Sequence, residues 1–143
     1  MSLPVVVLPG RRGIVPRIDA FTRRFWDSLE QGEFLGSRCM QCGRRSFPAR
    51  RVCPGCGSID TEWIPLATQG KLYSATVIHA GPGAYWAGGA YTVGIVDLDD
   101  GVRLLTRILG PIPPPMDSAV QLVLTRHDDG CLFAAIACPA NAT

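Results

Sequence analysis

The chain contains two knuckles, Cys39-Met40-Gln41-Cys42-Gly43 and Cys53-Pro54-Gly55-Cys56-Gly57, with ten residues between Cys42 and Cys53. Each C-x-x-C places two sulfurs on one tight turn, close enough to share a tetrahedral metal. The glycine after each second cysteine removes a Cβ where the backbone must turn sharply. The four thiolates Cys39, Cys42, Cys53 and Cys56 therefore predict a rubredoxin-like four-cysteine site for structural Zn²⁺ on a short two-stranded ribbon. We favour zinc over bound iron and over a redox dithiol.

Six cysteines in 143 residues also suit the disulfide framework of a secreted protein. The N-terminal residues do not favour export, because the apolar run Val5 to Leu8 is short and lies between Pro4 and Pro9. No stretch reaches the roughly twenty apolar residues that a membrane helix needs. We therefore expect a cytoplasmic protein, in which paired thiols are more often metal ligands than disulfides. Cys131 and Cys138 lie in an apolar stretch and are expected to be buried small hydrophobes.

Basic residues gather in the first half of the chain. Residues 1–64 hold ten Arg against six acids, whereas residues 65–143 hold four Lys and Arg against six acids. Five arginines lie in or beside the predicted ribbon, in a run without Asp or Glu: Arg38, Arg44, Arg45, Arg50 and Arg51. Such a patch favours an anionic partner, which could be a phosphate-bearing cofactor, a nucleic acid or an acidic protein. The alternative is an ordinary solvated ribbon surface.

The residues before the ribbon predict an arm and a helix. Residues 1–16 carry three prolines and two glycines, which is typical of an extended or mobile arm. Asp19 is expected to cap a helix that ends near residue 31, with Phe21, Phe25 and Leu29 on one apolar stripe and Trp26 beside it. This amphipathic helix packs either on its own domain or on a partner protein. Both alternatives stay open here, and these three aromatic residues are the candidate docking residues.

After Gly70 the sequence changes to five short β-like runs: Leu72–His79, Tyr91–Leu98, Val102–Leu109, Ala119–Arg126 and Cys131–Ala137. Asp99-Asp100-Gly101 predicts a tight hairpin between the second and third runs. Five short strands favour a closed barrel, because a small open sheet leaves unprotected edges, and the OB-fold is the leading candidate. Residues 111–115 hold four prolines and predict a rigid loop where that fold usually has a helix. The predicted chain is mainly β and has four segments: an arm (1–16), a helix (17–34), a zinc ribbon (35–66) and an OB-fold barrel (67–143).

The order of helix, four-cysteine ribbon and barrel, together with short motifs within each segment, resembles a known family. These are the zinc-ribbon plus OB-fold proteins long catalogued as a domain of unknown function and associated with acyl-CoA metabolism. The matching sequence extends from about Phe21 to Pro139 and includes Glu62-Trp63 and residues 70–76. Two positions depart from the pattern. Many members have Pro-Pro-Arg where this chain has Pro48-Ala49-Arg50, and many have Gly where Asp117 stands, although Asp tolerates some left-handed turns.

The resemblance implies an accessory protein without its own catalytic residues. Family members are typically encoded and assembled with thiolase-like enzymes, aldolases or hydratases that act on CoA thioesters, and the partner usually supplies the catalysis. Arg50 and Arg51 are the candidate ligands for the phosphates of an acyl-CoA. Tyr85 and Trp86, in the glycine-rich loop 81–89, are candidates to cover a ligand or a partner. The alternative for this loop is an ordinary hairpin whose aromatic side chains lie on the barrel.

No catalytic constellation is visible in the sequence. His79 and His127 are the only histidines, and no adjacent Ser, Cys or carboxylate arrangement makes either a convincing general base. An autonomous acyl-CoA enzyme is therefore disfavoured. The competing class is a single-stranded nucleic-acid-binding protein, because zinc ribbons and OB barrels both recur there. The slightly acidic barrel half argues against it, since its predicted strands carry few aromatic residues: Tyr73, Tyr91 and Phe133.

Overall fold

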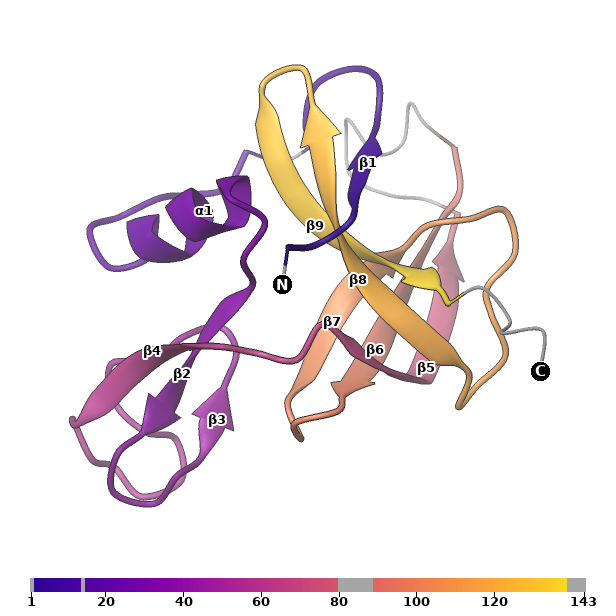
Figure 1. Ribbon diagram of the computed structural model, residues 1–143. Helices are drawn as coiled ribbons and strands as arrows, with labels where there is room; N and C mark the ends of the chain where they lie inside the picture. The colour runs from indigo at the N-terminus through magenta and orange to yellow at the C-terminus, as the bar shows by residue number, and fades with distance from the viewer. Residues whose placement is uncertain (1, 14, 80–88, 139–143) are drawn as a thin grey trace.

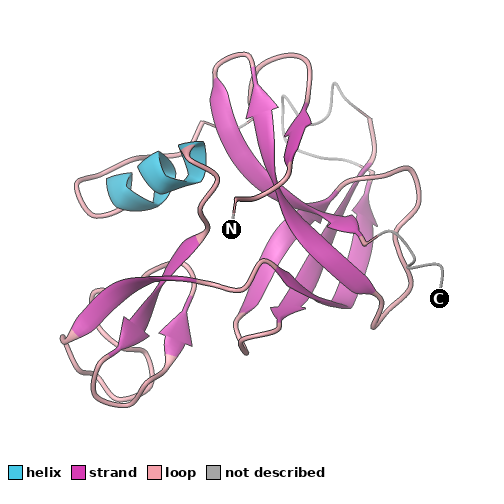
Figure 2. Cartoon of the chain, in the orientation of Figure 1, coloured by secondary structure: helices cyan, strands magenta, loops and turns pink. Residues whose placement is uncertain are grey.

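Two β-sheets and one short helix make up the computed structural model of the chain, which describes residues 2–13, 15–79 and 89–138 (Figures 1 and 2). In chain order the elements are β1 (Val5–Val7), α1 (Arg23–Glu30), β2 (Leu35–Cys39), β3 (Arg45–Ser46), β4 (Thr61–Pro65), β5 (Gln69–Ile78), β6 (Tyr91–Leu98), β7 (Arg103–Ile108), β8 (Ala119–His127) and β9 (Gly130–Ala137). The smaller sheet is the ribbon, with strand order β3-β2-β4. The short strand β3 makes it three-stranded, where the knuckle spacing alone predicted two strands.

The larger sheet is a five-stranded barrel with β1 added at one edge. Its strand order is β1-β8-β5-β6-β7-β9, and β8 also pairs with β9 from Val120↔Ala137 to His127↔Gly130. Strand β7 meets β9 in parallel at Ile108↔Ala135, which closes the barrel. Residues 109–118, all of them described, contain no helix. The predicted mainly β chain with an OB-fold barrel is confirmed.

The barrel interior is filled by alternate residues of its strands. Burial alternates along β6 and β7, and the side chains of Leu72, Val96 and Leu122 are fully buried. Gly94 stands at an inward position of β6, where a Cβ atom would lie 2.9 Å from the side chains of both Leu72 and Ile108. Glycine in this strand therefore lets two large aliphatic side chains meet inside the barrel.

The N-terminal arm, expected to be extended or mobile, is extended in the described part of residues 1–16 and packs on the barrel. Strand β1 pairs in parallel with β8, and Leu3 beside it is buried. Arg12 then ties the following loop to the β8–β9 turn: its backbone N–H donates to Asp129 Oδ1 at 2.8 Å, and its Nη2 donates to the Asp129 carbonyl at 3.0 Å. A strand of three residues between prolines is too short to show alternation of polar and apolar residues. Its pairing with β8 therefore becomes visible only in the folded barrel.

The helix begins and ends close to the predicted residues. The carboxylate of Asp19 accepts backbone N–H groups at 2.9 and 2.7 Å in the turn that precedes α1, so helical hydrogen bonding starts slightly later than predicted. The stop is Gly32, whose φ of +84° suits a residue without a Cβ and whose N–H donates to the Leu29 carbonyl at 2.9 Å.

Four phenylalanines join the helix, the ribbon and the barrel. Phe25 of α1, Phe34 before β2, Phe47 after β3 and Phe133 of β9 all contact one another, with ring centroids 4.8 to 6.2 Å apart. Helix α1 accordingly lies against the side of the barrel at β9, above the ribbon (Figure 1). Because Phe25 is only 8% exposed, the helix packs on its own chain through this residue. We call this set the phenylalanine cluster.

Candidate functional site

The four knuckle sulfurs lie together at one end of the ribbon. All four lie within 4.8 Å of one another, with 3.5 Å between the sulfurs of Cys39 and Cys56 and 3.6 Å between those of Cys42 and Cys53. A tetrahedral zinc with Zn–S bonds of about 2.3 Å holds its sulfurs roughly 3.8 Å apart. All six cysteines are free thiols in this structure, and four of them gather as a set of metal ligands. The donor set and its geometry fit a zinc site with four cysteine ligands.

The electrostatics of the four sulfurs are compatible with a bound cation. The backbone N–H of Cys42, followed by that of Gln41, lowers the pKa of Cys39 to about 6. Although the backbone N–H of Ser58 favours its thiolate, the neighbouring sulfurs, Cys39 first, raise the pKa of Cys56 to about 12. The knuckle turns therefore stabilise the first thiolates, and mutual repulsion opposes the last one. A divalent metal ion removes that repulsion.

A second candidate feature is a basic cavity of about 520 Å³ between the ribbon and the barrel. The ribbon contributes Arg44, Arg45 and Arg50, and β7 of the barrel contributes Arg103. Asp100, in the β6–β7 turn, is the acidic residue among the described residues that line it. Four guanidinium groups against one carboxylate make this cavity a candidate site for an anion with several phosphate oxygens.

Two of the four arginines already have carboxylate partners. Arg45 Nη1 lies 3.3 Å from Asp100 Oδ2, and Arg103 Nε donates to Asp97 Oδ1 at 2.6 Å. Within the described residues, Arg44 and Arg50 form no ion pair. The side chains of Arg44 and Arg50 are thus the ones best placed to meet an incoming anion.

The structure separates the two arginines that the sequence proposed together. Arg50 lines the basic cavity, whereas the guanidinium of Arg51 lies 4.6 Å from the ring centroid of Phe21 in a cation–π contact. The backbone of Arg50 is held independently of its side chain, since its N–H donates to Ser37 Oγ at 2.9 Å and its carbonyl accepts from Thr61 Oγ1 at 3.0 Å. Only Arg50 of this pair belongs to the cavity.

A third feature is an aromatic hollow of about 280 Å³ where the helix, the ribbon and the barrel meet. Its aromatic lining consists of Phe21, Phe25, Trp26, Phe47, Trp63 and Phe133. The rings of Phe21 and Trp63 contact each other at its edge, with centroids 5.1 Å apart. Phe21 and Trp26 are half-buried and face this hollow, whereas Phe25 forms its buried base. The candidate docking residues are therefore two accessible aromatic side chains and one core side chain.

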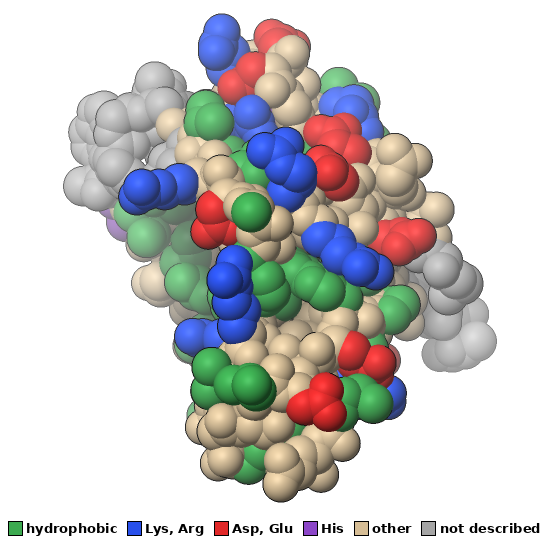
Figure 3. Space-filling view, turned by 90° about the vertical axis from the view of Figure 1, so that its left-hand side faces the viewer, with side chains coloured by type: hydrophobic (Ala, Val, Ile, Leu, Met, Phe, Trp, Pro, Cys, Tyr) green, Lys and Arg blue, Asp and Glu red, His purple; other side chains and the backbone are tan. Residues whose placement is uncertain are grey.

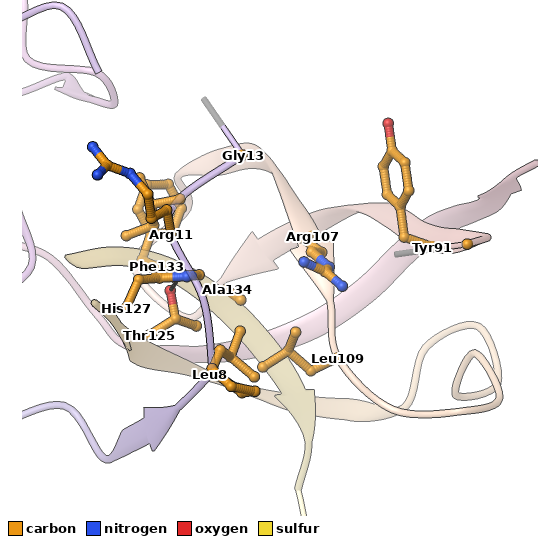
Figure 4. Close-up of a pocket in the computed structure, with 13 residues that line it drawn as sticks. Leu8, Arg11, Gly13, Tyr91, Arg107, Leu109, Thr125, His127, Phe133 and Ala134 are labelled. Atoms are coloured by element: carbon orange, nitrogen blue, oxygen red, sulfur yellow. Dashed lines mark hydrogen bonds between the residues drawn. The ribbon is translucent and has the colours of Figure 1, made fainter. Parts of the chain in front are cut away.

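A fourth cavity, of about 280 Å³, lies at the end of the barrel (Figure 4). Arg107 stands between Tyr91 on one side and His127 on the other. The hydrogen-bond partner of the His127 ring among the described residues is Thr125, with Nε2 and Oγ1 3.1 Å apart. Burial lowers the pKa of His127, so its imidazole is neutral at pH 7. Thr125 is thus paired with the ring, but no carboxylate of the described residues forms a hydrogen bond that would orient the ring for general base catalysis.

Three candidates lie outside these cavities: Cys131, Cys138 and His79. Cys131 is buried, and burial raises the pKa of its thiol to about 12, which makes it a poor nucleophile. Cys138 is half-buried, and His79 lies just beyond β5 outside the cavities described above. Tyr85 and Trp86 lie outside the described residues. The described part of the chain holds no helix that is both long and apolar enough to cross a membrane.

Sequence reasoning missed how the basic cavity is assembled. The acid-free run marked the ribbon arginines, but nothing local connected them with Arg103 and Asp100, which lie more than fifty residues away in the barrel. Arg45 and Asp100 come together only when the ribbon folds onto the β6–β7 turn. The sequence feature that could have indicated this contact is the predicted hairpin at Asp99-Asp100-Gly101, because an acidic turn is a natural partner for the basic ribbon.

The fold and the cysteine site define a zinc-ribbon protein with a C-terminal OB-fold barrel. The chain belongs to the ChsH2-type family, also called DUF35. Residues 26–62 match the model described as "ChsH2, rubredoxin-like zinc ribbon domain", and residues 63–125 match "ChsH2, C-terminal OB-fold domain". The resemblance seen in the sequence is thereby confirmed.

Three relatives illustrate the family. A "DUF35 domain-containing scaffold protein" of Methanocaldococcus jannaschii is 30% identical over 106 residues, which is 73% of this chain and 75% of the relative. The "Benzoylsuccinyl-CoA thiolase subunit BbsA" of Thauera aromatica is 33% identical over 75 residues, 52% of this chain and 51% of that subunit. The solved structure of an "Ltp2-ChsH2(DUF35) aldolase" superposes with a TM-score of 0.73 at 27% identity and covers 86% of this chain and 98% of its own.

Proposed function

We propose that this chain is a non-catalytic, zinc-containing accessory subunit. It docks a thiolase-like, aldolase or hydratase partner and helps that partner hold a CoA thioester. The names of its relatives support the docking role, since they describe a scaffold protein, a thiolase subunit and part of an aldolase assembly. The observation that carries the CoA role is the basic cavity between ribbon and barrel.

The chemistry of CoA matches this cavity. The molecule carries a 3′-phosphate and a pyrophosphate, which present several anionic oxygens to planar guanidinium donors. Arg44 and Arg50 meet these oxygens first, while Arg45 and Arg103 add positive charge from positions already fixed by carboxylates. The thioester and its acyl group then extend toward the partner, which supplies the reacting groups.

The proposed metal is a structural Zn²⁺ bound by Cys39, Cys42, Cys53 and Cys56. All four coordination positions are filled by protein sulfurs in this arrangement, so no position is left for a substrate. Bound zinc supplies charge neutralisation of the thiolates and a crosslink between the two knuckles. Its effect on the CoA site is indirect, because the ribbon that it stabilises carries Arg44, Arg45 and Arg50.

Calorimetric titration of the zinc-loaded chain with acetyl-CoA tests the CoA role. We expect saturable binding that Arg50→Glu weakens at least about tenfold, the effect of losing a charge-assisted hydrogen bond. Arg51→Glu is the matched control, because its side chain lies on Phe21 rather than in the cavity. Equal losses in both variants, or no binding in the presence of the co-expressed partner, would overturn the assignment.

An oligothymidylate of matched charge tests the competing class. Binding of this strand without a response to acetyl-CoA would identify the protein as a single-stranded nucleic-acid binder. The barrel does place Arg103 over the ring of Tyr73, with 3.8 Å to the centroid, so this ring face is already occupied. Steady hydrolysis or cleavage of the thioester by the purified, partner-free chain would contradict the non-catalytic role.

A further inference from the structure

We propose that the aromatic hollow is an anchor pocket. It receives one aromatic side chain that a partner protein presents within an acidic segment. This inference rests on the proposed docking function and specifies the chemistry of the partner at the docking surface. Four observations carry it: the size and lining of the hollow, the apolar surface around it, the charge of its rim, and its rigid support.

The size and lining favour a single side chain. At about 280 Å³ the hollow lies at the lower limit of small-molecule sites, which occupy roughly 300–1,000 Å³. Phe21, Trp26 and Trp63 present half-buried aromatic rings to it, and such rings prefer tilted or edge-on contacts with another aromatic ring. Buried aromatic anchors in pockets of this kind supply much of the binding energy of protein interfaces.

The surroundings favour a protein over a free acyl chain. The residues that flank the hollow in the sequence expose three aliphatic side chains: Val15 (59%), Ile18 (44%) and Val52 (51%). An acyl chain inserted in the hollow would leave this apolar surface in water, whereas a protein segment covers it. Figure 3 shows the face that carries α1 and the ribbon, with hydrophobic side chains gathered across its middle among Lys, Arg, Asp and Glu side chains.

The rim is basic. Arg17 lines the hollow and is exposed. The guanidinium of Arg51 lies over the ring of Phe21, which also lines the hollow. None of the residues described as lining the hollow is acidic. Asp19, close to Arg51, turns its carboxylate to backbone N–H groups of the helix-initiating turn. Carboxylates beside the incoming aromatic side chain therefore complement the rim.

The support is rigid, because the base of the hollow is the phenylalanine cluster. Phe25, Phe47 and Phe133 come from three different parts of the fold and contact one another. The hollow therefore exists before the partner arrives, which reduces the entropy lost on binding. Ala49 lines it from the ribbon side and is half-buried, so a larger side chain there fills the hollow without removing an existing contact.

Nuclear magnetic resonance with short peptides tests the pocket directly. The probes are acetyl-Glu-Glu-Phe-Glu-Glu-amide, the same peptide with Lys in place of Glu, and the same peptide with Ser in place of Phe. The indole N–H signals of Trp26 and Trp63 report occupancy, since both rings line the hollow. We expect saturating shifts with the acidic Phe peptide and at least tenfold weaker binding of both others. Equal binding of all three, or no binding up to millimolar concentration, overturns the proposal.

Substitutions provide the second test. Ala49→Leu should abolish the shifts and Arg17→Glu should weaken them severalfold, whereas the exposed barrel residues in Ala119→Leu and Lys71→Glu serve as matched controls without effect. If octanoyl-CoA shifts the same indole signals and Ala49→Leu removes its advantage over acetyl-CoA, the hollow binds the acyl chain and the proposal is wrong. Co-elution separates this outcome from failure of the docking function. A thiolase-like partner that co-elutes equally with wild type and Ala49→Leu leaves docking intact but overturns the anchor pocket.

Discussion

Asp100 joins the barrel to the ribbon by accepting a hydrogen bond from Arg45. Its Oδ2 lies 3.3 Å from Arg45 Nη1, and the same oxygen accepts the backbone N–H of Ala67 at 2.8 Å in the segment that connects the two modules. One carboxylate in the β6–β7 turn therefore holds the ribbon, the connection and the barrel in a fixed relation. It also supplies the acidic group of the otherwise basic cavity.

Asp100→Ala should lower the free energy of unfolding by about 1–3 kcal/mol, because it leaves the Ala67 N–H and Arg45 without their acceptor. It should also raise the affinity for acetyl-CoA, since the cavity loses its negative charge. Urea unfolding and calorimetry measure the two effects. Asp99→Ala in the same turn is the control, because the Asp99 side chain is exposed. A stability loss of the same size in both variants would contradict the bridging role.

The phenylalanine cluster and the rim of the hollow should respond differently to truncation. Phe34→Ala should cost about 3–5 kcal/mol of stability, since its ring is 2% exposed and contacts three other rings. Phe21→Ala should cost less than about 1.5 kcal/mol but should release a docked partner. Chemical denaturation and co-elution from a sizing column separate these effects. A large stability loss in Phe21→Ala would place this residue in the core instead of the docking surface.

Local patterns explain which parts of this fold could be predicted. The knuckles repeat a short spacing, strands β6 and β7 alternate, and turn residues separate the barrel strands, so their positions can be predicted from neighbouring residues. Strand β1 has three residues and forms by pairing with β8, more than a hundred residues later in the chain. The same holds for the cavity, because Arg45 and Asp100 are 55 residues apart in the chain. Contacts between modules have no local signature.

The helix shows the same limit at the level of one residue. Its apolar stripe correctly indicated the buried residues Phe25 and Leu29 of α1, but periodicity does not say what covers them. Phe25 is covered by Phe34, Phe47 and Phe133, two of which lie beside strands of the ribbon. Intramolecular packing thus accounts for two of the three residues of the stripe, whereas Phe21 lies half-buried in the turn before the helix.

Zinc removal should unfold the ribbon before the barrel. We expect one Zn²⁺ per chain by elemental analysis, and Cys53→Ser should destabilise the ribbon by several kcal/mol, because the site loses one of its four ligands and with it much of the binding free energy of the metal. Amide exchange should then accelerate in β2 to β4 and remain slow in β6 and β8, whose core residues are fully buried. Cys138→Ser, far from the knuckles in sequence, is the matched control. One iron atom per chain would identify the bound metal as iron instead of zinc. Unchanged amide exchange in the ribbon after metal removal would contradict a structural role of the metal.

The link between the N-terminal loop and the barrel should weaken in acid. The backbone N–H of Arg12, assisted by its guanidinium, holds the pKa of Asp129 below its ordinary value. A carboxyl group with a lowered folded-state pKa contributes stability above its unfolded pKa of about 3.9, and this contribution disappears as the pH falls through the lower folded value. Asp129→Asn should therefore flatten the fall in melting temperature below about pH 4. Asp128→Asn, at an exposed neighbour, is the control; identical profiles for wild type and Asp129→Asn would contradict this link.

Asp117 should be the position where glycine stabilises the barrel. It has a φ of +64°, the left-handed region that costs an L residue roughly 1 kcal/mol. The conformation is imposed by pairing with β5, because the Asp117 N–H donates to the Leu72 carbonyl at 2.7 Å and the Leu72 N–H donates to the Ser118 carbonyl at 3.0 Å. Asp117→Gly relieves the strain and should raise the free energy of unfolding by up to about 1 kcal/mol, whereas Asp117→Val should lower it by about 1–2 kcal/mol. Met116→Gly is the control and should destabilise the protein. Met116 has no positive φ, so glycine there relieves no strain and only increases the conformational entropy of the unfolded chain. Equal destabilisation by glycine at positions 116 and 117 would mean that the aspartate side chain, rather than the backbone, shapes this turn.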